Sequence, residues 1–364
     1  MILVLSIVAA LWLFVPSWAG ALPLYASREG KTCVSCHHDP NGGGMRNDFG
    51  FLYGKNRHGM DTEQKWADVT VDPRINEWIA LGMDTRVLYV ASHTEGGRTL
   101  GTSSFLPMQG QLNVALTPHD HLTVVMSRGI TIDPNSFEAR ELYGMIHDLP
   151  HNIYAKVGRF RLPFGLRQDD HTSYIRTTQF LPYDSQLDDA GIEIGTAGPR
   201  YFGQLSFTNG DGTISAERAQ TLAAKTGFAG QRLAAGISGF HQFQELTDIT
   251  NDRWGLYALS TWQKFTFLGE YDRGTEEAPL GTRNLWGTFA ELDYRLARGI
   301  NLRGKIDYLD PNDDVSGDLY RRWLVEADIV PVPFTEMKLS YRSHDDEGPF
   351  GEYQEYLVQF FFPF

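Results

Sequence analysis

Apolar and polar residues alternate along most of the chain from about residue 75 onward. In the stretch 286–295, the even positions are mostly apolar and the odd positions are mostly polar. The stretch 323–329 repeats the pattern with its charged residues on the even positions. A period of two is typical of a β-strand whose two faces meet different surroundings. The alternation therefore predicts an all-β fold.

The alternating stretches divide into sixteen candidate strands, separated by turn-forming residues. An even number of strands is typical of bacterial single-chain barrels. We therefore predict a transmembrane antiparallel β-barrel of about 16 strands over residues 71–364. The candidate strands are 76–92, 103–116, 120–131, 137–148, 152–160, 188–197, 199–209, 219–229, 231–245, 251–262, 263–273, 283–297, 299–310, 317–330, 334–345 and 352–364.

The predicted connections alternate between short and long. In a soluble barrel the charged residues would face water outside, whereas in a membrane barrel they line a wet lumen and the apolar residues face lipid. Short periplasmic turns with longer external loops are a feature of the membrane class, and a soluble sandwich has no reason to keep this rhythm. The short connections are Pro118-His119, Pro150-His151, Gly198, Gly230, Gln263, Arg298-Gly299 and 331–333, and the long ones include 209–216, 274–281, 311–317 and 345–351.

The longest predicted connection runs from Arg161 to Leu187 and is the third external loop. Its position resembles that of the third loop of general porins, which folds into the lumen and narrows it. That resemblance predicts a constriction, although a loop lying outside the barrel is the alternative. The residues expected to line the constriction are Arg167, Asp169, Asp170, His171 and Arg176.

Both ends of the chain carry features of an exported outer-membrane protein. Residues 1–21 join an apolar run to the cleavage pattern Ala19-Gly20-Ala21, which predicts a secretory signal peptide; a retained N-terminal helix is the alternative. The last residues are aromatic or apolar at every second position and close on Phe364. This ending resembles the signal by which outer-membrane barrels are recognised for assembly. The composition, with 22 Phe, 16 Tyr, 37 Gly and a net charge of −13, agrees with such a barrel.

Residues 22–70, between the signal peptide and the barrel, contain the pattern C-x-x-C-H at Cys33, Cys36 and His37. This pattern is the attachment site of a c-type haem, since two thiols bond to the porphyrin vinyl groups and the imidazole binds the iron. A zinc site would need further ligands, and the chain has no other cysteine. A disulfide bond or a redox-active C-x-x-C pair would also account for two cysteines at this spacing. We predict a small monohaem cytochrome c-like module with one covalent haem c and His37 as the proximal iron ligand.

The distal haem ligand is less well defined by the sequence. Met45 and His58 are the candidates, Met60 has weaker support, and a site without a distal protein ligand is also possible. His38 adjoins His37 and is not expected to reach the opposite face of the haem. Met45 is slightly favoured, because it follows the flexible run 42–44 of three glycines, which can fold back.

A signal peptide, one C-x-x-C-H module and a barrel of this size resemble the fused monohaem cytochrome c–porin proteins of bacterial outer membranes. The resemblance rests on Cys33, Cys36 and His37, on the downstream Phe49-Gly50, and on the barrel with its terminal Phe364. The best-known members of that family are outer-membrane cytochromes that oxidise ferrous iron. The resemblance implies a haem held at or inside one end of a pore.

Two functions follow from these features. The first is electron transfer between an extracellular donor or acceptor, such as Fe²⁺, and a periplasmic electron-transfer protein, with the acidic clusters 313–314 and 345–347 concentrating the cation. The alternative is a diffusion or uptake porin whose haem is structural or regulatory. The same acidic loops could instead bind divalent ions between lipopolysaccharide molecules. Outer-membrane lipids are expected partners and nucleic acid is not, and the sequence contains no motif of a hydrolase or an NTPase.

Overall fold

The computed structural model describes residues 24–60, 72–94, 103–129, 139–168, 170, 172–177, 179–182, 188–210, 219–230, 232–347 and 351–364. The predicted signal peptide, residues 1–21, lies outside the described residues. Within them, none of the helices combines the length and the apolar character that crossing a bilayer requires.

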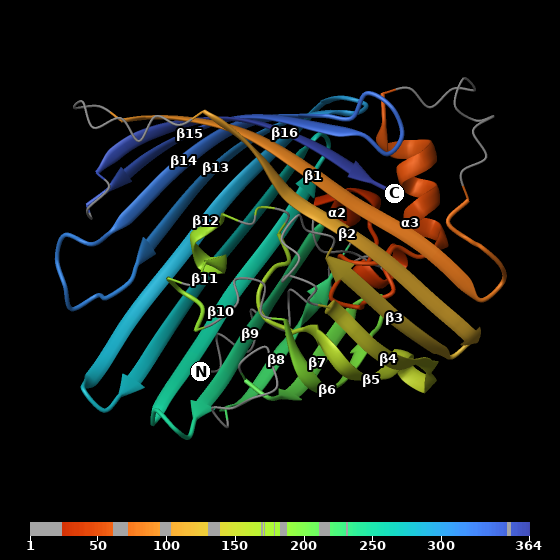
Figure 1. Ribbon diagram of the computed structural model, residues 1–364, viewed down its shortest axis with the longest axis horizontal. Helices are drawn as coiled ribbons and strands as arrows, with labels where there is room; N and C mark the ends of the chain where they lie inside the picture. The colour runs from red at the N-terminus through yellow and green to blue at the C-terminus, as the bar shows by residue number, and fades with distance from the viewer. Residues whose placement is uncertain are drawn as a thin grey trace, which may run out of the picture.

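Sixteen strands form one closed antiparallel barrel, in which each strand pairs with the next along the chain (Figure 1). The last strand closes the ring by pairing with the first, for example with Arg86 opposite Phe361. Closure leaves no free strand edge, and it confirms the predicted sixteen-stranded barrel. The strands are β1 (Ile79–Thr94), β2 (Ser104–His119), β3 (Leu122–Gly129), β4 (Ala139–Leu149), β5 (Ile153–Arg161), β6 (Asp188–Ala197), β7 (Tyr201–Thr208), β8 (Ala219–Ala229), β9 (Leu233–Gln244), β10 (Ile249–Trp262), β11 (Phe265–Ala278), β12 (Gly281–Ala297), β13 (Ile300–Asp310), β14 (Tyr320–Ile329), β15 (Glu336–Asp346) and β16 (Glu352–Pro363).

One predicted long loop is wrong. Residues 274–281 were expected to form an external loop, but β11 and β12 remain paired until Ala278 faces Gly281. Cross-strand contacts stabilise this extension, since Arg283 lies 2.7 Å from Glu276 across the ladder. Two residues, 279 and 280, are enough to connect these strands. The polar composition that suggested a loop therefore belongs to a pair of strands reaching beyond the apolar part of the barrel.

The two faces of the wall differ as the alternation predicted. On β13, Leu302 and Ile306 point outward and are 41% and 45% exposed, whereas Lys305 and Asp307 point inward and are 3% and 1% exposed. β14 repeats this arrangement, with an exposed Trp323 beside inward-facing neighbours. An apolar exterior with a charged interior is the arrangement of a transmembrane barrel and the reverse of a soluble one.

The two ends of the barrel differ in their connections. One end, which we call the turn end, carries the short connections that follow the even-numbered strands; β1 begins there and β16 ends there. The short helix η3 (Pro150–Asn152) lies in one of these turns. The opposite end, which we call the loop end, carries the connections that follow the odd-numbered strands. The predicted rhythm of short and long connections holds for most of the barrel. The loop-end connections after β9 and β11 are short, and the turn-end connection 330–335 is longer than the loop-end connection 347–351.

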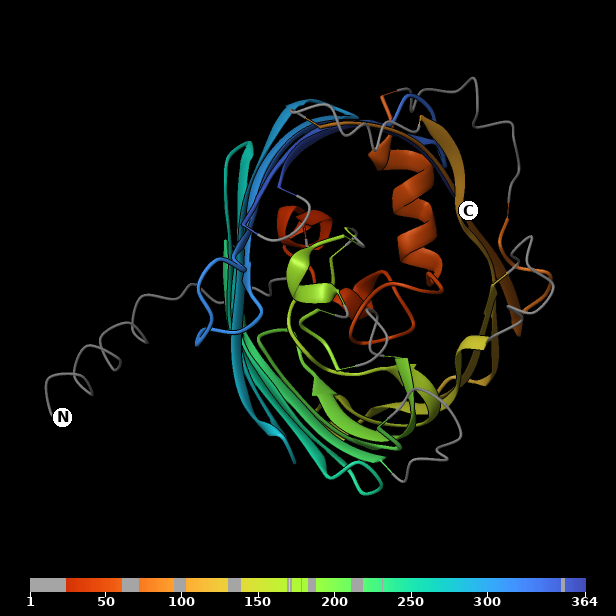
Figure 2. The same cartoon turned by 60° about the vertical axis from the view of Figure 1, so that its left-hand side comes forward.

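Two segments fill the lumen. The first is residues 24–60, which we call the N-terminal segment, and the second consists of the described residues between 162 and 182, which we call the inner loop. Figure 2 shows both segments inside the ring of strands, the first in red and orange and the second in yellow-green. Their helices are α2 (Leu24–Glu29), η1 (Cys33–Ser35), α3 (Asp48–Tyr53) and η2 (Gly54–His58) in the N-terminal segment, and η4 (Tyr174–Arg176) in the inner loop.

Candidate functional site

The C-x-x-C-H stretch lies in the lumen, on the tight turn η1. The backbone amide of His37 donates to the carbonyl of Cys33 at 3.0 Å, which holds the turn closed. The side chain of Asn47 binds this turn to α3: its amide donates to the carbonyl of Val34, and its oxygen caps the helix at Gly50. The buried Cys33 also borders a small cavity of about 30 Å³ that it shares with the barrel wall.

The three glycines after the haem motif are required by close contacts. Gly42, Gly43 and Gly44 have φ values of +83°, +70° and +58°, which favour glycine over other residues. A Cβ atom on Gly43 would collide with the guanidinium of Arg167, and one on Gly44 would collide with the carboxylate of Glu141. The loop between the haem motif and Met45 is therefore pressed against the inner loop and against β4.

Buried ionic groups attach the same loop to the wall. The ammonium of Lys156 on β5 lies 3.2 Å from Asp39 and 3.1 Å from Glu193 on β6, and all three side chains are at most 1% exposed. The hydroxyl of Tyr154 donates to Glu193 at 2.7 Å. The side-chain amide of Asn41 reaches the same carboxylate at 3.4 Å. The inward positions of Lys156 and Glu193 follow from the strand alternation, but their contact with Asp39 of the N-terminal segment was not predicted.

The inner loop crosses the lumen, as its position in the chain predicted. Arg167 donates to the carbonyl of Gly42, so the inner loop contacts the haem-motif loop directly. Arg176 lies 2.6 Å from Glu270 and 3.2 Å from Asp272, both on β11. The placement of Arg167 and Arg176 inside the barrel is thereby confirmed.

The far side of the inner loop is held by an ion cluster. Asp170 lies 2.8 Å from the ammonium of Lys305 on β13 and 3.3 Å from the guanidinium of Arg322 on β14. Its predicted place in the lumen is confirmed. The two other predicted constriction residues, Asp169 and His171, lie outside the described residues.

The residues of the motif fit a covalently bound haem. Cys33 and Cys36 are both thiols rather than the two halves of a disulfide bond, and burial raises the pKa of Cys33 to about 11. The Nδ1 atom of His37 is out of contact with solvent and has no hydrogen-bond partner among the described residues. Burial, together with the nearby Arg46, lowers the pKa of His37 to about 3. The ring is thus neutral, which is the form that binds a metal.

A recess of about 610 Å³ opens at the turn end between the N-terminal segment and the wall. Tyr25, Tyr53 and His58 line it, and the rings of Tyr25 and His58 meet edge to face at 4.5 Å. The Nε2 atom of His58 is buried without a hydrogen-bond partner among the described residues. Burial lowers the pKa of this histidine to about 4. His58 therefore offers a neutral, unsatisfied imidazole beside a space that is open at the turn end.

The other candidate distal ligand, Met45, has different surroundings. It is 3% exposed and packs against the wall, where a Cβ atom on Gly82 of β1 would lie 3.1 Å from its sulfur. The cavity beside it holds only about 10 Å³. Met60, the weaker candidate, is 47% exposed and sits at the β14–β15 turn, where its amide donates to the carbonyl of Val330.

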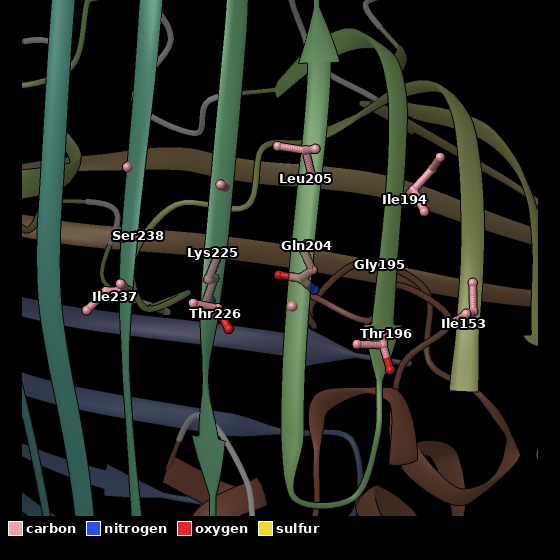
Figure 3. Close-up of a pocket in the computed structure, with 13 residues that line it drawn as sticks. Ile153, Ile194, Gly195, Thr196, Gln204, Leu205, Lys225, Thr226, Ile237 and Ser238 are labelled. Atoms are coloured by element: carbon pink, nitrogen blue, oxygen red, sulfur yellow. The ribbon is translucent and has the colours of Figure 1, made fainter. Parts of the chain in front are cut away.

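A second hollow, of about 620 Å³, lies in the wall over β5 to β9 (Figure 3). It is lined mainly by outward-facing aliphatic side chains, such as Ile194, Leu205 and Ile237, each more than half exposed. Gly203 and Gly239 add no side chains on this face. The hollow therefore belongs to the apolar outer surface, and nothing in its lining suggests chemistry.

Comparison with solved structures identifies the class of fold. A loop L8 deletion mutant of OmpT, an outer membrane protein of Vibrio cholerae, matches with a TM-score of 0.64 at 9% sequence identity, covering 79% of this chain and 99% of that chain. An anion-selective porin from Comamonas acidovorans matches with a TM-score of 0.60 at 9% identity over 79% and 99% of the two chains. The outer membrane channel DcaP of Acinetobacter baumannii matches with a TM-score of 0.56 at 12% identity over 79% and 97%. The chain is similar to these proteins in its fold, that of outer-membrane porins.

No protein-family model and no curated protein matches the chain. At identities of 9% to 12% the likeness defines the architecture and carries no residue of a site. The interpretation of the C-x-x-C-H stretch as a haem attachment site therefore depends on this chain's own sequence and on the surroundings described above.

Proposed function

We propose that this protein is an outer-membrane barrel with a haem-bearing segment in its lumen, and that it transfers electrons between an extracellular donor or acceptor and a periplasmic redox protein. Ferrous iron is the donor that we consider first. The observation that carries the proposal is the position of Cys33, Cys36 and His37, which lie inside a closed barrel and are attached to its wall through neighbouring residues. A porin without a redox role does not require a C-x-x-C-H stretch in its lumen.

The topology supports a periplasmic position for the haem. Short turns face the periplasm in outer-membrane barrels, and in this barrel the short turns lie at the end where β1 begins. The recess beside His58 opens at the same end. Since the hydrocarbon core of a bilayer is about 30 Å thick, a single haem cannot connect both faces alone. A small donor must therefore enter the lumen from the loop end, or the haem must exchange electrons at the turn end.

The chain's own residues would hold and orient the group. Cys33 and Cys36 would form the two thioether bonds, and His37 would bind the iron. The buried pair of Asp39 and Lys156 would fix the loop that carries these ligands, and Arg167 would fix it from the inner loop. When bound, the haem would supply a one-electron redox centre.

A second function is favoured by the comparisons. The matched structures are an anion-selective porin, an outer membrane channel and an outer membrane protein. A diffusion or uptake porin with a structural or regulatory haem is therefore the other candidate. Against free diffusion stands the filled lumen, in which inward charges such as Lys305 and Asp307 are buried by the inner loop.

Two measurements on the same purified protein separate these candidates. In sealed proteoliposomes with the loop end outward, Fe²⁺ added outside should reduce the haem quickly, and more slowly at high salt because screening weakens attraction to the acidic loops. In planar bilayers, the electron-transfer function predicts low conductance with the segment in place. With Fe²⁺ as the donor, electrons move from the loop end toward the turn end. Rapid reduction of the haem only by donors enclosed within the liposomes, on the side of the turn end, would contradict this direction of electron transfer. Porin-like conductance that is the same in the wild type and in a Cys33→Ala/Cys36→Ala variant would favour the diffusion porin.

A further inference from the structure

Exposed charge is unevenly distributed between the two ends of the barrel. At the turn end, four consecutive turns from β6–β7 to β12–β13 each carry one exposed basic residue. The described residues of these turns include no aspartate or glutamate. We call this set the basic rim, and its members are Arg200, Arg232, Lys264 and Arg298.

The loop end of the same strands has the opposite character. Its described connections and strand ends expose mainly carboxylates, in a chain whose net charge is −13. On these strands the exposed negative charge is therefore concentrated at the loop end. The basic rim is a local feature of the turn end, at whose β2–β3 and β4–β5 turns the carboxylates of Asp120 and Asp148 are exposed. The exposed acidic residues at the loop end include Glu245, Asp248, Glu277, Asp313 and Asp314.

The recess at the turn end continues the basic rim toward the haem motif. Besides Lys264 and Arg298, it is lined by Arg28, Arg57 and Arg295, with Glu29 as its one carboxylate. Glu29 lies 3.6 Å from Arg57, which remains 65% exposed. One carboxylate among five cations leaves the recess strongly positive.

The cations of the recess bind mostly neutral groups. Arg28 donates to the side-chain oxygen of Asn301 at 2.6 Å, and its Nη2 atom is buried without a hydrogen-bond partner among the described residues. Lys264 and Arg298 donate to backbone carbonyls, those of Leu296 and Asn56. Such bonds orient the cations without neutralising them, so that their charge is available to a ligand.

We infer that the basic rim and the recess together form the docking surface for an acidic face of a periplasmic redox protein. This inference rests on the proposed function, for which it names the chemistry of the partner. Complementary charge mainly raises the rate of encounter and selects the partner, and it loses effect as salt increases. The surface lies close to Cys36, because α3 packs against the backbone of that residue, where a Cβ atom on Gly50 would collide with the Cys36 carbonyl, and Tyr53 at the end of α3 lines the recess. A partner docked here would stand next to the haem motif.

Anionic lipid headgroups could also attract basic residues at a membrane surface. A protein is favoured because part of the positive charge lies inside the ring of strands, where lipid does not reach. Arg57 belongs to η2 and Arg28 to α2, and both helices are in the lumen (Figure 2). A surface that served lipid alone would need its cations only on the outer circumference.

The test measures binding by surface plasmon resonance on holoprotein in nanodiscs of zwitterionic phosphatidylcholine. The probe is an acidic soluble monohaem cytochrome c, and its partner control is the same cytochrome with amidated carboxylates. The rim variant is Arg200→Gln/Arg232→Gln/Lys264→Gln. The matched control, Asp248→Asn/Glu277→Gln/Asp314→Asn, neutralises the same number of charges at the loop end. Unchanged heat-modifiability in gels confirms that both variants are folded.

The acidic cytochrome should bind the wild type and the loop-end control equally, and the rim variant roughly tenfold more weakly. The amidated cytochrome should not bind. Equal binding of the acidic cytochrome to wild type and rim variant overturns the inference. The inference is also overturned if the acidic cytochrome fails to bind while vesicles of anionic phosphatidylglycerol bind the wild type and not the rim variant, because the rim would then be a lipid site.

The result of this binding experiment can be distinguished from the result of the haem-reduction experiment that tests the proposed function. If the acidic cytochrome docks at the rim but exchanges no electrons with the haem, the docking surface stands and the proposed electron transfer fails. If Fe²⁺ reduces the haem while the rim variant binds like the wild type, electron transfer stands and the docking surface fails.

Discussion

The ammonium nitrogen of Lys156 lies 3.2 Å from a carboxylate oxygen of Asp39, and neither side chain is more than 1% exposed. Lys156 belongs to β5 in the wall, whereas Asp39 follows the C-x-x-C-H stretch by two residues. The pair is therefore a direct link between the barrel and the proposed haem ligands. Removing one partner of a buried ion pair leaves an uncompensated charge and destabilises by about 3–5 kcal/mol.

A Lys156→Met substitution should accordingly loosen the N-terminal segment, because Asp39 and Glu193 would remain as two buried carboxylates without their cation. We expect rapid cleavage of the segment by an added protease and a loss of about 3–5 kcal/mol in its docking stability in urea. Lys264→Met is the matched control, since that residue is exposed and its ammonium meets a backbone carbonyl and the ring of Tyr294 rather than a buried carboxylate. Equal protease resistance in both variants would show that the pair does not hold the segment.

The glycine run gives a second prediction. Gly43→Ala should destabilise the loop by at least about 1 kcal/mol, because a residue with a Cβ atom is disfavoured at positive φ. The new methyl group would also collide with Arg167 and push the inner loop away. The matched control is Gly304→Ala, whose Cβ would meet nothing within 4 Å. Comparing urea midpoints and protease sensitivity of the two variants tests this, and identical behaviour would refute the contact.

Haem attachment is tested most directly at the thiols. Cys33→Ala/Cys36→Ala should abolish haem staining on a denaturing gel, because both thioether bonds are lost. The barrel should remain heat-modifiable, since neither residue belongs to a strand. A haem stain that survives in the double variant would exclude the c-type assignment.

The strand pattern could be predicted because each wall residue has only two possible directions. The alternation at Leu302, Arg303 and Ile306 separated the two faces, and the rhythm of the connections indicated that the charged face lines the lumen. The predicted strand 219–229 coincides with β8. The pattern failed at 274–281, where polar residues on an extended hairpin look like those of a loop. Local sequence does not indicate how far two strands remain paired beyond the apolar zone.

Less of the candidate functional site than of the fold could be predicted from the sequence. The alternation places Lys156 and Glu193 in the lumen, but it contains no information that Asp39, more than a hundred positions away, lies between them. Likewise, the run 42–44 was expected only to be a loop, whereas its glycines are required by Arg167 and Glu141. Contacts between a segment in the lumen and its wall depend on the three-dimensional docking, which a repeating pattern along one chain does not encode.

The C-terminal residue links the barrel to the N-terminal segment. The ring of Phe364 lies 5.9 Å from that of Phe51 on α3 and 5.8 Å from that of Phe334 in the β14–β15 turn. Its backbone also exchanges two hydrogen bonds with Met83 on β1. Deleting Phe364 should therefore reduce the yield of assembled barrel, as its place in the assembly signal predicts, and should also loosen the segment.

The two roles of Phe364 can be separated. Phe334→Ala should leave assembly intact but loosen the segment by about 0.5–1.5 kcal/mol, the contribution of an aromatic pair. Leu280→Ala, at a fully exposed position of the loop end, is the control for both readouts. Yields are measured by heat-modifiability in outer-membrane fractions. If the Phe364 deletion assembles as well as Leu280→Ala does, the terminal residue has no special role in assembly.

The last prediction concerns the distal ligand. The sequence slightly favoured Met45, because the preceding glycines could fold back. We propose His58 instead, since Met45 is packed against Gly82 with little free space, whereas His58 lines the recess and its Nε2 atom has no hydrogen-bond partner among the described residues. Two histidine ligands would give a lower reduction potential than a histidine and a methionine.

We therefore expect that His58→Ala changes the optical spectrum of the holoprotein and opens the iron to added imidazole, whereas Met45→Leu changes neither. The wild type should lack the weak charge-transfer band that methionine ligation produces at the red end of the oxidised spectrum. A potentiometric titration adds a readout that does not depend on a partner protein. The reduction potential of the haem should change in His58→Ala and should remain that of the wild type in Met45→Leu. If the band is present in the wild type and disappears in Met45→Leu, then the methionine binds the iron. The loop would in that case have to leave its contact with β1 when the haem is attached.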